Sequence, residues 1–262
     1  PGFLLVGLYI FYIFIISIIR PENAPAIPKS ELAAFTPKTL FIRAMKALFP
    51  PLFLMVAVLG SIFAGIASPT EAAAVGAVGA MVLTIANRKF NIKILREVMH
   101  STLQLTCMVF IILVGAAAFG LVFRGLGGDG LVREFLGGIA HEHSKWFVLF
   151  IVMALIFVIG FFLDFIEITF IHVPVLAPIM IEFGFDPLWF CILIAVNLQT
   201  SFMTPPFGFS LFYLKAVTPP EISTGHIYRG IIPFVFFQLI GLLIVVFFPK
   251  LVTWLPKIVF AH

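Results

Sequence analysis

Runs of apolar residues, each ended by a short polar or proline-containing segment, occupy most of this 262-residue sequence. They cover residues 3–19, 52–66, 70–86, 102–123, 146–163, 165–181, 188–217 and 231–248. A membrane-spanning helix needs roughly 17–25 predominantly apolar residues. The pattern therefore predicts an all-α polytopic membrane protein.

The composition excludes the soluble classes of protein. Hydrophobic residues make up 62% of the chain and charged residues 11%, whereas soluble domains carry about 25% charged residues. A chain with a mean hydropathy of +1.18 cannot cover a water-facing surface with polar atoms. A soluble enzyme, a nucleic-acid binder and a disordered chain are therefore excluded. Cys107 and Cys191 lie inside apolar runs, so neither a disulfide nor a metal site is expected there.

The distribution of lysine and arginine orients the apolar runs, because cytoplasmic loops are enriched in these residues. Loops 20–46 and 87–99 carry most of the basic residues, which predicts that both are cytoplasmic and places segment 124–145 outside. The predicted organisation is a transmembrane helix over 1–19, a cytoplasmic loop with an amphipathic segment over 20–50, scaffold-like transmembrane helices over 51–123 and a periplasmic loop over 124–145.

The next segment, residues 146–182, must begin and end on the outer side, and two interpretations satisfy this. It forms either two full spans with an inner turn at residues 162–165, or a re-entrant hairpin whose tip stops inside the membrane. Two full spans would put Asp164 and Glu167 on the side that prefers Lys and Arg. We favour the hairpin, since non-helical backbone is tolerated at membrane depth where protein or a cavity surrounds it.

A polar, proline-containing stretch interrupts the following segment, which predicts a broken transmembrane helix over 187–217 and a last transmembrane helix with a periplasmic C-terminus over 218–262. Pro205 and Pro206 remove two backbone donors, and Gly208 adds flexibility. Polar side chains gather at the same depth: Asn197, Gln199, Thr200, Ser201 and Thr204. Free carbonyls and hydroxyls suit a dehydrated sodium ion, and the positive end of a helix suits a carboxylate. The alternative is a proline kink whose hydroxyls bond back to the helix.

Asp164 and Glu167 are intramembrane carboxylates, which are costly enough to be functional by default. They bind a cation, relay protons, or cap the second arm of the hairpin, with Asp164 at its N-terminus. Capping accounts well for Asp164 and less well for Glu167. His172 is predicted to be a hydrogen-bonded interior histidine rather than a ligand.

The segment 68–80 predicts a helix rich in Ala and Gly that packs closely against neighbouring helices. Pro69 suits the helix start, with Ser68 as its cap and Glu71 near the positive end of the helix.

These motifs together resemble the large membrane subunit of the tripartite ATP-independent periplasmic (TRAP) transporters. The matching pieces follow in the family's order: Pro1-Gly2, residues 68–74, Leu163-Asp164, Pro174 and Pro178, Asp186-Pro187, and residues 204–208, 229–233 and 254–256. The likeness covers essentially the whole chain, and the ordered set is specific although each piece alone is weak. Residues 197–202 are similar to the subgroup often labelled mannitol/chloroaromatic.

The resemblance implies a sodium-driven importer of small organic acids in the bacterial inner membrane. In the family, a periplasmic binding protein delivers the substrate and a small membrane subunit packs against the large one. The large subunit is an inverted repeat with one hairpin and one broken helix per half, and it moves by an elevator mechanism. On that pattern residues 146–181 are the second hairpin and residues 197–208 its partner break.

The family's first repeat has no counterpart in this sequence, and Pro1 directly precedes an apolar run without a leader. We therefore expect the C-terminal part of a longer protein, that is, the second half of an inverted-repeat elevator-type transporter. Lys and Arg are absent between Trp146 and Leu214. The charge that recognises a substrate carboxylate is therefore expected in the other half.

We predict one Na⁺ site beside the substrate, and no catalytic residue or cofactor. The backbone near Gly160 and Asp164 forms it together with Asn197, Thr200, Thr204 and the carbonyl region of Pro205 and Pro206. Glu167, Gln199, Ser201 and Gly208 complete the candidate set. The alternatives are an intramembrane enzyme with Asp164 and Glu167 as an acid/base pair, a membrane scaffold subunit, and an ATP-driven permease that depends on a separate ATPase.

Overall fold

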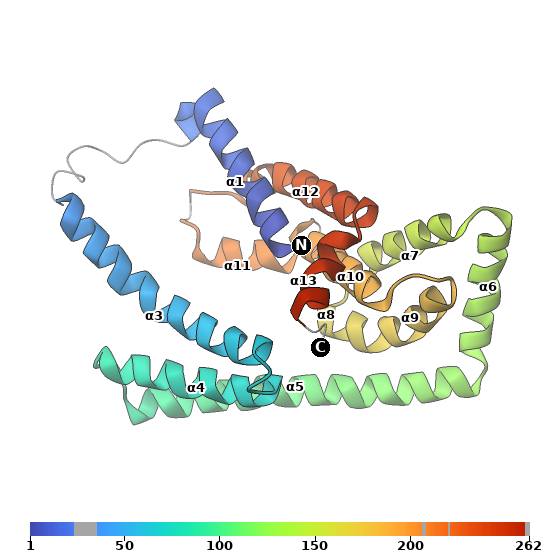
Figure 1. Ribbon diagram of the computed structural model, residues 1–262, viewed down its shortest axis with the longest axis horizontal. Coiled ribbons are helices and arrows are strands. Elements are labelled where there is room, and N and C mark those ends of the chain that lie inside the picture. The colour runs from blue at the N-terminus through green and yellow to red at the C-terminus, as the bar shows by residue number, and fades with distance from the viewer. Residues whose placement is uncertain (24–35, 206–207, 220, 260–262) are drawn as a thin grey trace. The chain divides into compact units, whose positions relative to one another are not determined.

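The computed structural model describes residues 1–23, 36–205, 208–219 and 221–259, and every regular element in these ranges is a helix (Figure 1). In chain order the elements are α1 (Gly2–Ile19), η1 (Pro21–Asn23), α3 (Pro37–Phe63), α4 (Pro69–Ala86), α5 (Ile92–Gly125), α6 (Gly128–Glu142), α7 (Lys145–Ile159), α8 (Phe165–Glu167), η2 (Ile168–His172), α9 (Val173–Glu182), α10 (Pro187–Met203), α11 (Phe209–Val217), α12 (Thr224–Phe247) and α13 (Lys250–Val259).

Six helices within the described ranges are long and apolar enough to cross a membrane. They are Gly2–Ile19, Lys38–Phe63, Pro69–Ala86, Ile92–Gly125, Phe165–Glu182 and Thr224–Phe247. α7 and α10 are shorter apolar helices. The prediction of an all-α polytopic membrane protein is confirmed.

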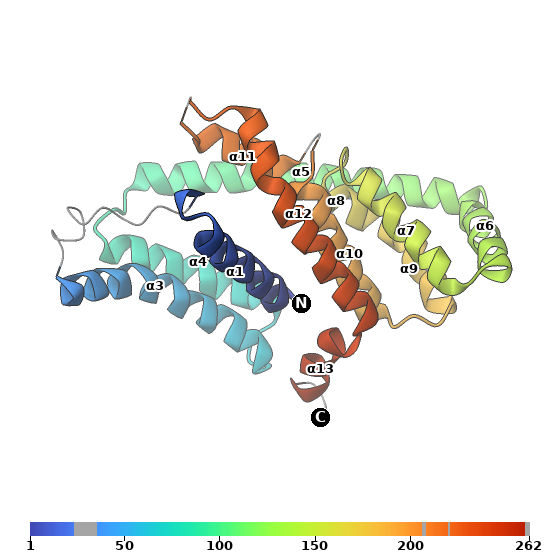
Figure 2. The same cartoon turned by 90° about the horizontal axis from the view of Figure 1, so that it is seen from above.

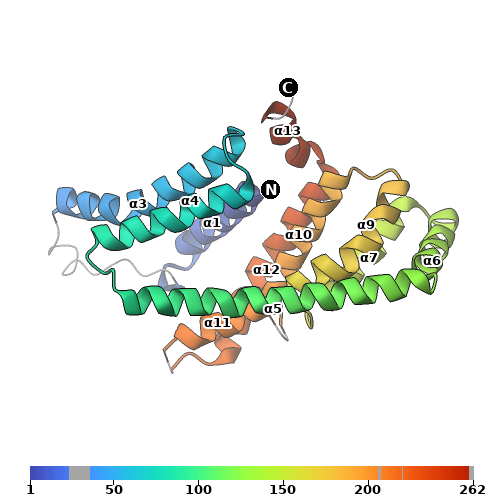
Figure 3. The same ribbon diagram turned by 90° about the horizontal axis from the view of Figure 1, so that it is seen from below.

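The chain divides into two compact units, of which the smaller comprises Ser17–Leu105. Within it α3 and α4 lie side by side (Figure 3). The small residues of α4 allow this approach: a Cβ on Gly76 would lie 3.3 Å from Val58 Cγ2, and one on Gly79 would overlap Leu54 Cδ1. The small-residue face of α4 is thus a packing surface, as expected from its composition.

Two helices begin in segments that the sequence predicts as loops. α3 begins at Pro37 and continues through Pro50 and Pro51, so that it includes much of the described part of segment 20–50; residues 24–35 lie outside the described ranges. Segment 124–145 is mostly α6, because Val132, Leu136 and Ile139 recur at helical spacing and pack into the core. The turn between α5 and α6 is short, and Gly127 provides its positive φ of 77°.

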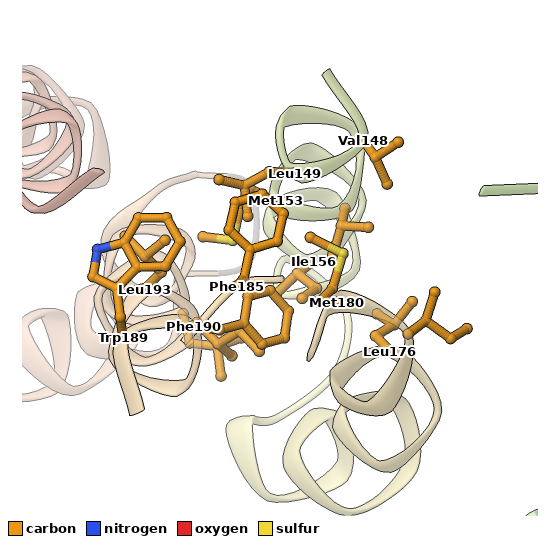
Figure 4. Packing of buried hydrophobic residues seen from close by; sticks show 14 of the residues in the cluster. Val148, Leu149, Met153, Ile156, Leu176, Met180, Phe185, Trp189, Phe190 and Leu193 are labelled. Carbon is orange, nitrogen blue, oxygen red and sulfur yellow. The ribbon is translucent and has the colours of Figure 1, made fainter. Parts of the chain in front are cut away.

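The larger unit comprises Pro1–Ile16 and Thr106–His262. Its central helix is α10, which packs against α7, α9 and α12 (Figure 2). Apolar side chains of α7, α9 and α10 meet in one buried cluster that includes Ile156, Met180 and Phe190 (Figure 4). Trp189 Nε1 donates a hydrogen bond to the carbonyl of Val245 at 2.9 Å and joins α10 to α12. This unit holds the polar residues considered next.

Candidate functional site

The hairpin consists of α7, a turn, and the arm formed by α8, η2 and α9. The turn begins at Gly160, the C-cap of α7, and ends at Asp164, whose Oδ1 accepts a hydrogen bond from the amide of Phe165 at 2.8 Å. Asp164 therefore caps the second arm of the hairpin, which is one of the roles predicted for it from the sequence. α7 has 15 residues and is about 22 Å long, which is less than the roughly 30 Å of a bilayer core, whereas the second arm, Phe165–Glu182, is long enough to cross a membrane. A tip that stops inside the membrane remains our prediction for this hairpin.

His172 ends the π-helical segment η2. The prediction that it is hydrogen-bonded is wrong, because its Nδ1 is buried without a hydrogen-bond partner among the described residues. Its neighbours along the arm, Ile168 and Leu176, are buried apolar residues that belong to the core. An apolar environment explains why no partner is found.

The second component is the interruption between α10 and α11. Asp186 caps the start of α10 by accepting from the amide of Trp189 at 2.9 Å. α10 ends at Met203, and Thr204 has extended backbone angles, with φ −98° and ψ 133°. Pro205 follows in the connection, while Pro206, a predicted site residue, lies outside the described ranges. The helix is thus interrupted where the two prolines remove backbone donors.

The hydroxyl groups near this interruption bond back to their own helix. Thr200 Oγ1 donates to the carbonyl of Val196 at 2.9 Å, and Ser201 Oγ donates to that of Leu198 at 2.9 Å. Thr204 Oγ1 donates to the carbonyl of Thr200 at 2.7 Å. This is the geometry of the kink alternative. These hydrogen bonds do not compete with cation binding, since a hydroxyl group that donates its proton keeps two lone pairs as acceptors.

Besides their shared apolar core, α10 and the hairpin make two contacts that involve predicted site residues. Gly160 is buried, and a Cβ at this position would overlap Ser201 Oγ and lie 2.9 Å from Ser201 Cβ. One turn earlier along α10, Asn197 Nδ2 donates to the carbonyl of Met153 in α7 at 2.7 Å. Asn197 and Ser201 are themselves 2% and 1% exposed. The structure therefore brings three predicted site residues, Gly160, Asn197 and Ser201, into one contact region.

Gly208, the N-cap of α11, closes the interruption from the other side. A Cβ on this buried residue would lie 3.0 Å from both the Phe202 and the Thr204 carbonyl oxygens. The absence of a side chain thus lets the two carbonyls approach the start of α11. Ser210 Oγ donates to the Phe202 carbonyl at 3.0 Å. Ser210 was not among the residues predicted from the sequence. Its position, two residues after Gly208, could have indicated a hydroxyl that bonds back across the interruption.

The remaining predicted residues are not joined to this region. Within the described ranges, neither Asp164 nor Glu167 makes a side-chain hydrogen bond or ion pair with α10. Gln199 is exposed and lines a pocket of about 440 Å³ together with Phe165 and Thr169. The contact region thus contains amides, hydroxyls and carbonyls but no carboxylate.

These features describe a multi-pass membrane protein in which a helical hairpin packs beside an interrupted helix. The family described as "Tripartite ATP-independent periplasmic transporter, DctM component" matches residues 1–251. The chain belongs to this family, which confirms the resemblance drawn from its motifs.

Curated relatives carry names of the same kind. The chain is 31% identical over 259 residues to the C4-dicarboxylate TRAP transporter large permease protein DctM of Pseudomonas aeruginosa. The matched region covers 98% of this chain and 58% of that protein. It is 28% identical over 247 residues to the sialic acid TRAP transporter permease protein SiaT of Haemophilus influenzae, covering 92% of this chain and 38% of that protein. It is 28% identical over 263 residues to the ectoine/5-hydroxyectoine TRAP transporter large permease protein UehC of Ruegeria pomeroyi, covering 100% of this chain and 58% of that protein.

The chain thus spans little more than half the length of the first and third of these relatives, and less of the second. The relatives are named as transporter permeases rather than as enzymes, in agreement with the prediction that this chain is not an enzyme. The predicted location is confirmed as well: this is a multi-pass protein of the bacterial inner membrane. The relatives' names do not test the mannitol/chloroaromatic subgroup.

Proposed function

We propose that this chain forms part of a secondary transporter that imports a small organic acid together with Na⁺. The family assignment and the relatives' names support transport, since those names refer to C4-dicarboxylates, sialic acid and ectoine. All three ligands carry a carboxylate group. The substrate proposed for this protein is accordingly a small carboxylate.

The interruption of α10 is the observation on which the proposed sodium coupling rests. Sodium binds oxygen atoms, and interrupted membrane helices offer them as free carbonyls and hydroxyls. Here the Thr204 carbonyl oxygen lies close to Gly208, while the hydroxyls of Thr200 and Thr204 keep their lone pairs. The proposed ion site is centred on these groups, with Asn197 and Ser201 fixing the hairpin beside it.

The proposal includes the partners and motion that the family resemblance implies. A periplasmic binding protein delivers the substrate, and a small membrane subunit packs against the permease. The hairpin and the interrupted helix move together across the membrane as an elevator. Their shared apolar core and the contacts of Asn197 with Met153 and of Ser201 with Gly160 support movement as one body.

Uptake by the full-length permease, reconstituted in liposomes with its small subunit and binding protein, tests this proposal. Labelled C4-dicarboxylate, sialic acid and ectoine are offered under an inward sodium gradient or an equal potassium gradient. We expect sodium-dependent uptake of a carboxylate and its loss in Thr204→Ala. Thr84→Ala is the matched control, since Thr84 Oγ1 also bonds back to its own helix, at 2.8 Å from the Ala80 carbonyl. Equal uptake in both gradients would refute sodium coupling.

A further inference from the structure

One fully buried polar side chain lies in a helix that the sequence analysis did not connect with the site. Among the described residues, the buried polar side chains are Asn197, Thr200 and Ser201 of α10 and Gln238 of α12. Gln238 is 0% exposed and stands in the apolar helix Thr224–Phe247. A buried amide is costly unless its hydrogen bonds are formed, so its partners indicate what it contributes.

Gln238 bonds to two other helices. Its Oε1 accepts a hydrogen bond from the hydroxyl of Tyr9 in α1. Its Nε2 lies 3.5 Å from the carbonyl oxygen of Val196 in α10, in donor geometry. The same carbonyl accepts the hydroxyl of Thr200. Gln238 therefore bonds to the oxygen atom that orients one of the proposed sodium ligands.

Tyr9 supplies a second contact with α10. Its hydroxyl lies 3.8 Å from the sulfur atom of Met203, which is the last residue of α10. Val196 and Met203 are seven positions apart and therefore lie on the same face of the helix. Tyr9 and Gln238 thus contact α10 at both ends of its last two turns, which directly precede the interruption.

The packing of α1 on α12 holds this pair in place. The Tyr9 ring meets the Phe234 ring edge-on, with 5.3 Å between centroids. A Cβ on Gly241 would overlap Leu5 Cδ2, so the two helices are in close contact one turn beyond Gln238. Tyr12 contacts the rings of Phe234 and Phe237, but its hydroxyl has no hydrogen bond within the described ranges.

We propose that Tyr9 and Gln238 are positioning residues for the ion site. They hold the last two turns of α10 against α1 and α12, and they thereby set where Thr200 and the interruption at Thr204 present their oxygen atoms. The inference rests on the proposed function, because the site concerned is the same. It assigns the control of sodium affinity to residues that contact no ion.

The two tyrosines provide a matched experiment. Tyr9→Phe removes the hydroxyl that bonds Gln238, whereas Tyr12→Phe removes a hydroxyl without such a bond from the same helix. The measurement is the sodium concentration that gives half-maximal thermal stabilisation of the full-length permease in detergent. We expect Tyr9→Phe to raise this concentration about threefold to tenfold, the range of one lost hydrogen bond, and Tyr12→Phe to leave it unchanged. In potassium chloride Tyr9→Phe should melt below Tyr12→Phe, because the buried Gln238 loses a hydrogen-bond partner; the half-saturating sodium concentration is therefore the deciding measurement.

A second variant separates positioning from simple support of the fold. Gln238→Met keeps an unbranched side chain of similar length but removes both hydrogen bonds, and we expect the same shift in half-saturating sodium. A lower melting temperature in potassium chloride with unchanged half-saturation in both Tyr9→Phe and Gln238→Met would overturn the inference. Should the parent protein show no sodium-specific stabilisation, the proposed sodium coupling fails, and the inference fails with it. The two failures are therefore distinguishable.

Discussion

The corner before α4 and the corner before α8 have the same spacing of polar residues. Each has a helix cap, Ser68 or Asp164, followed three positions later by a glutamate, Glu71 or Glu167. At the first corner, Glu71 accepts hydrogen bonds from the Ser68 amide at 2.7 Å and the Ser68 hydroxyl at 2.8 Å, which completes a capping box.

At the second corner only the cap is formed. Asp164 accepts from the amide of Phe165, but Glu167 makes no side-chain hydrogen bond or ion pair within the described part of the chain. The capping box at the start of α4 therefore explains the position of Glu71, whereas capping does not explain the position of Glu167. The same spacing of polar residues thus places Glu71 in a structural role. Glu167, which is half-buried, has no such role and is available for a functional one.

The largest effect is expected at the turn before the second corner. In Gly160→Ala the new methyl group would collide with Ser201 and separate the hairpin from α10. We expect a loss of about 1–3 kcal/mol of stability together with a loss of uptake. Thermal melting and uptake measure the two effects.

Gly60→Ala is the control for this substitution, because Gly60 lies within α3 and a Cβ there has no neighbour within 4 Å. It should be neutral or slightly stabilising, since alanine is the better helix former. Equal behaviour of the two alanine variants would show that the Gly160–Ser201 contact is unimportant.

The two glutamates are compared directly by replacing each with alanine. Glu167→Ala should reduce sodium-dependent uptake roughly tenfold or more, as expected for a functional intramembrane carboxylate, without lowering the melting temperature in potassium chloride. Glu71→Ala should lower the melting temperature, because the capping box is lost, and retain uptake. If both variants behave alike, the difference between the two corners has no functional meaning.

Asp164 is tested by two replacements that differ in capping ability. Asparagine caps helices about as well as aspartate, whereas alanine does not, and losing the cap costs about 0.5–2 kcal/mol. We expect Asp164→Asn to keep the stability and the uptake of the parent, and Asp164→Ala to lose stability. Loss of sodium dependence in Asp164→Asn would instead assign the charge to the ion site.

The smallest effect is expected at the C-terminal end of the hairpin arm. Arg133 Nη2 lies 2.9 Å from Glu182 Oε1, and the two side chains are 56% and 50% exposed. Exposed pairs contribute about 0.2–1 kcal/mol, so Arg133→Ala should change the melting temperature little and leave uptake intact. A large decrease in either would mean that α6 controls the hairpin.

Much of the fold can be predicted from the sequence because lipid exposure requires long apolar runs, and the helix at residues 231–248 is an example. The prediction fails where a helix is amphipathic rather than uniformly apolar. α6 was therefore expected to be a loop, because its apolar residues cover only one face and glycines surround its start.

The candidate site was predictable where chemistry is local. Proline has no amide hydrogen, so the interruption after Met203 follows from Pro205 and Pro206. Contacts between helices were not predictable, because no spacing along the chain brings Gly160 to Ser201 or Tyr9 to Gln238.

The most direct test of the central claim is the melting temperature of the full-length permease in sodium, potassium and choline chloride at equal ionic strength. A ligand at a hundred times its dissociation constant stabilises the folded state by about 2.7 kcal/mol. We predict a sodium-specific rise of this order that decreases in Thr204→Ala and persists in Thr84→Ala. Identical melting in the three salts would contradict a sodium site at the interruption of α10.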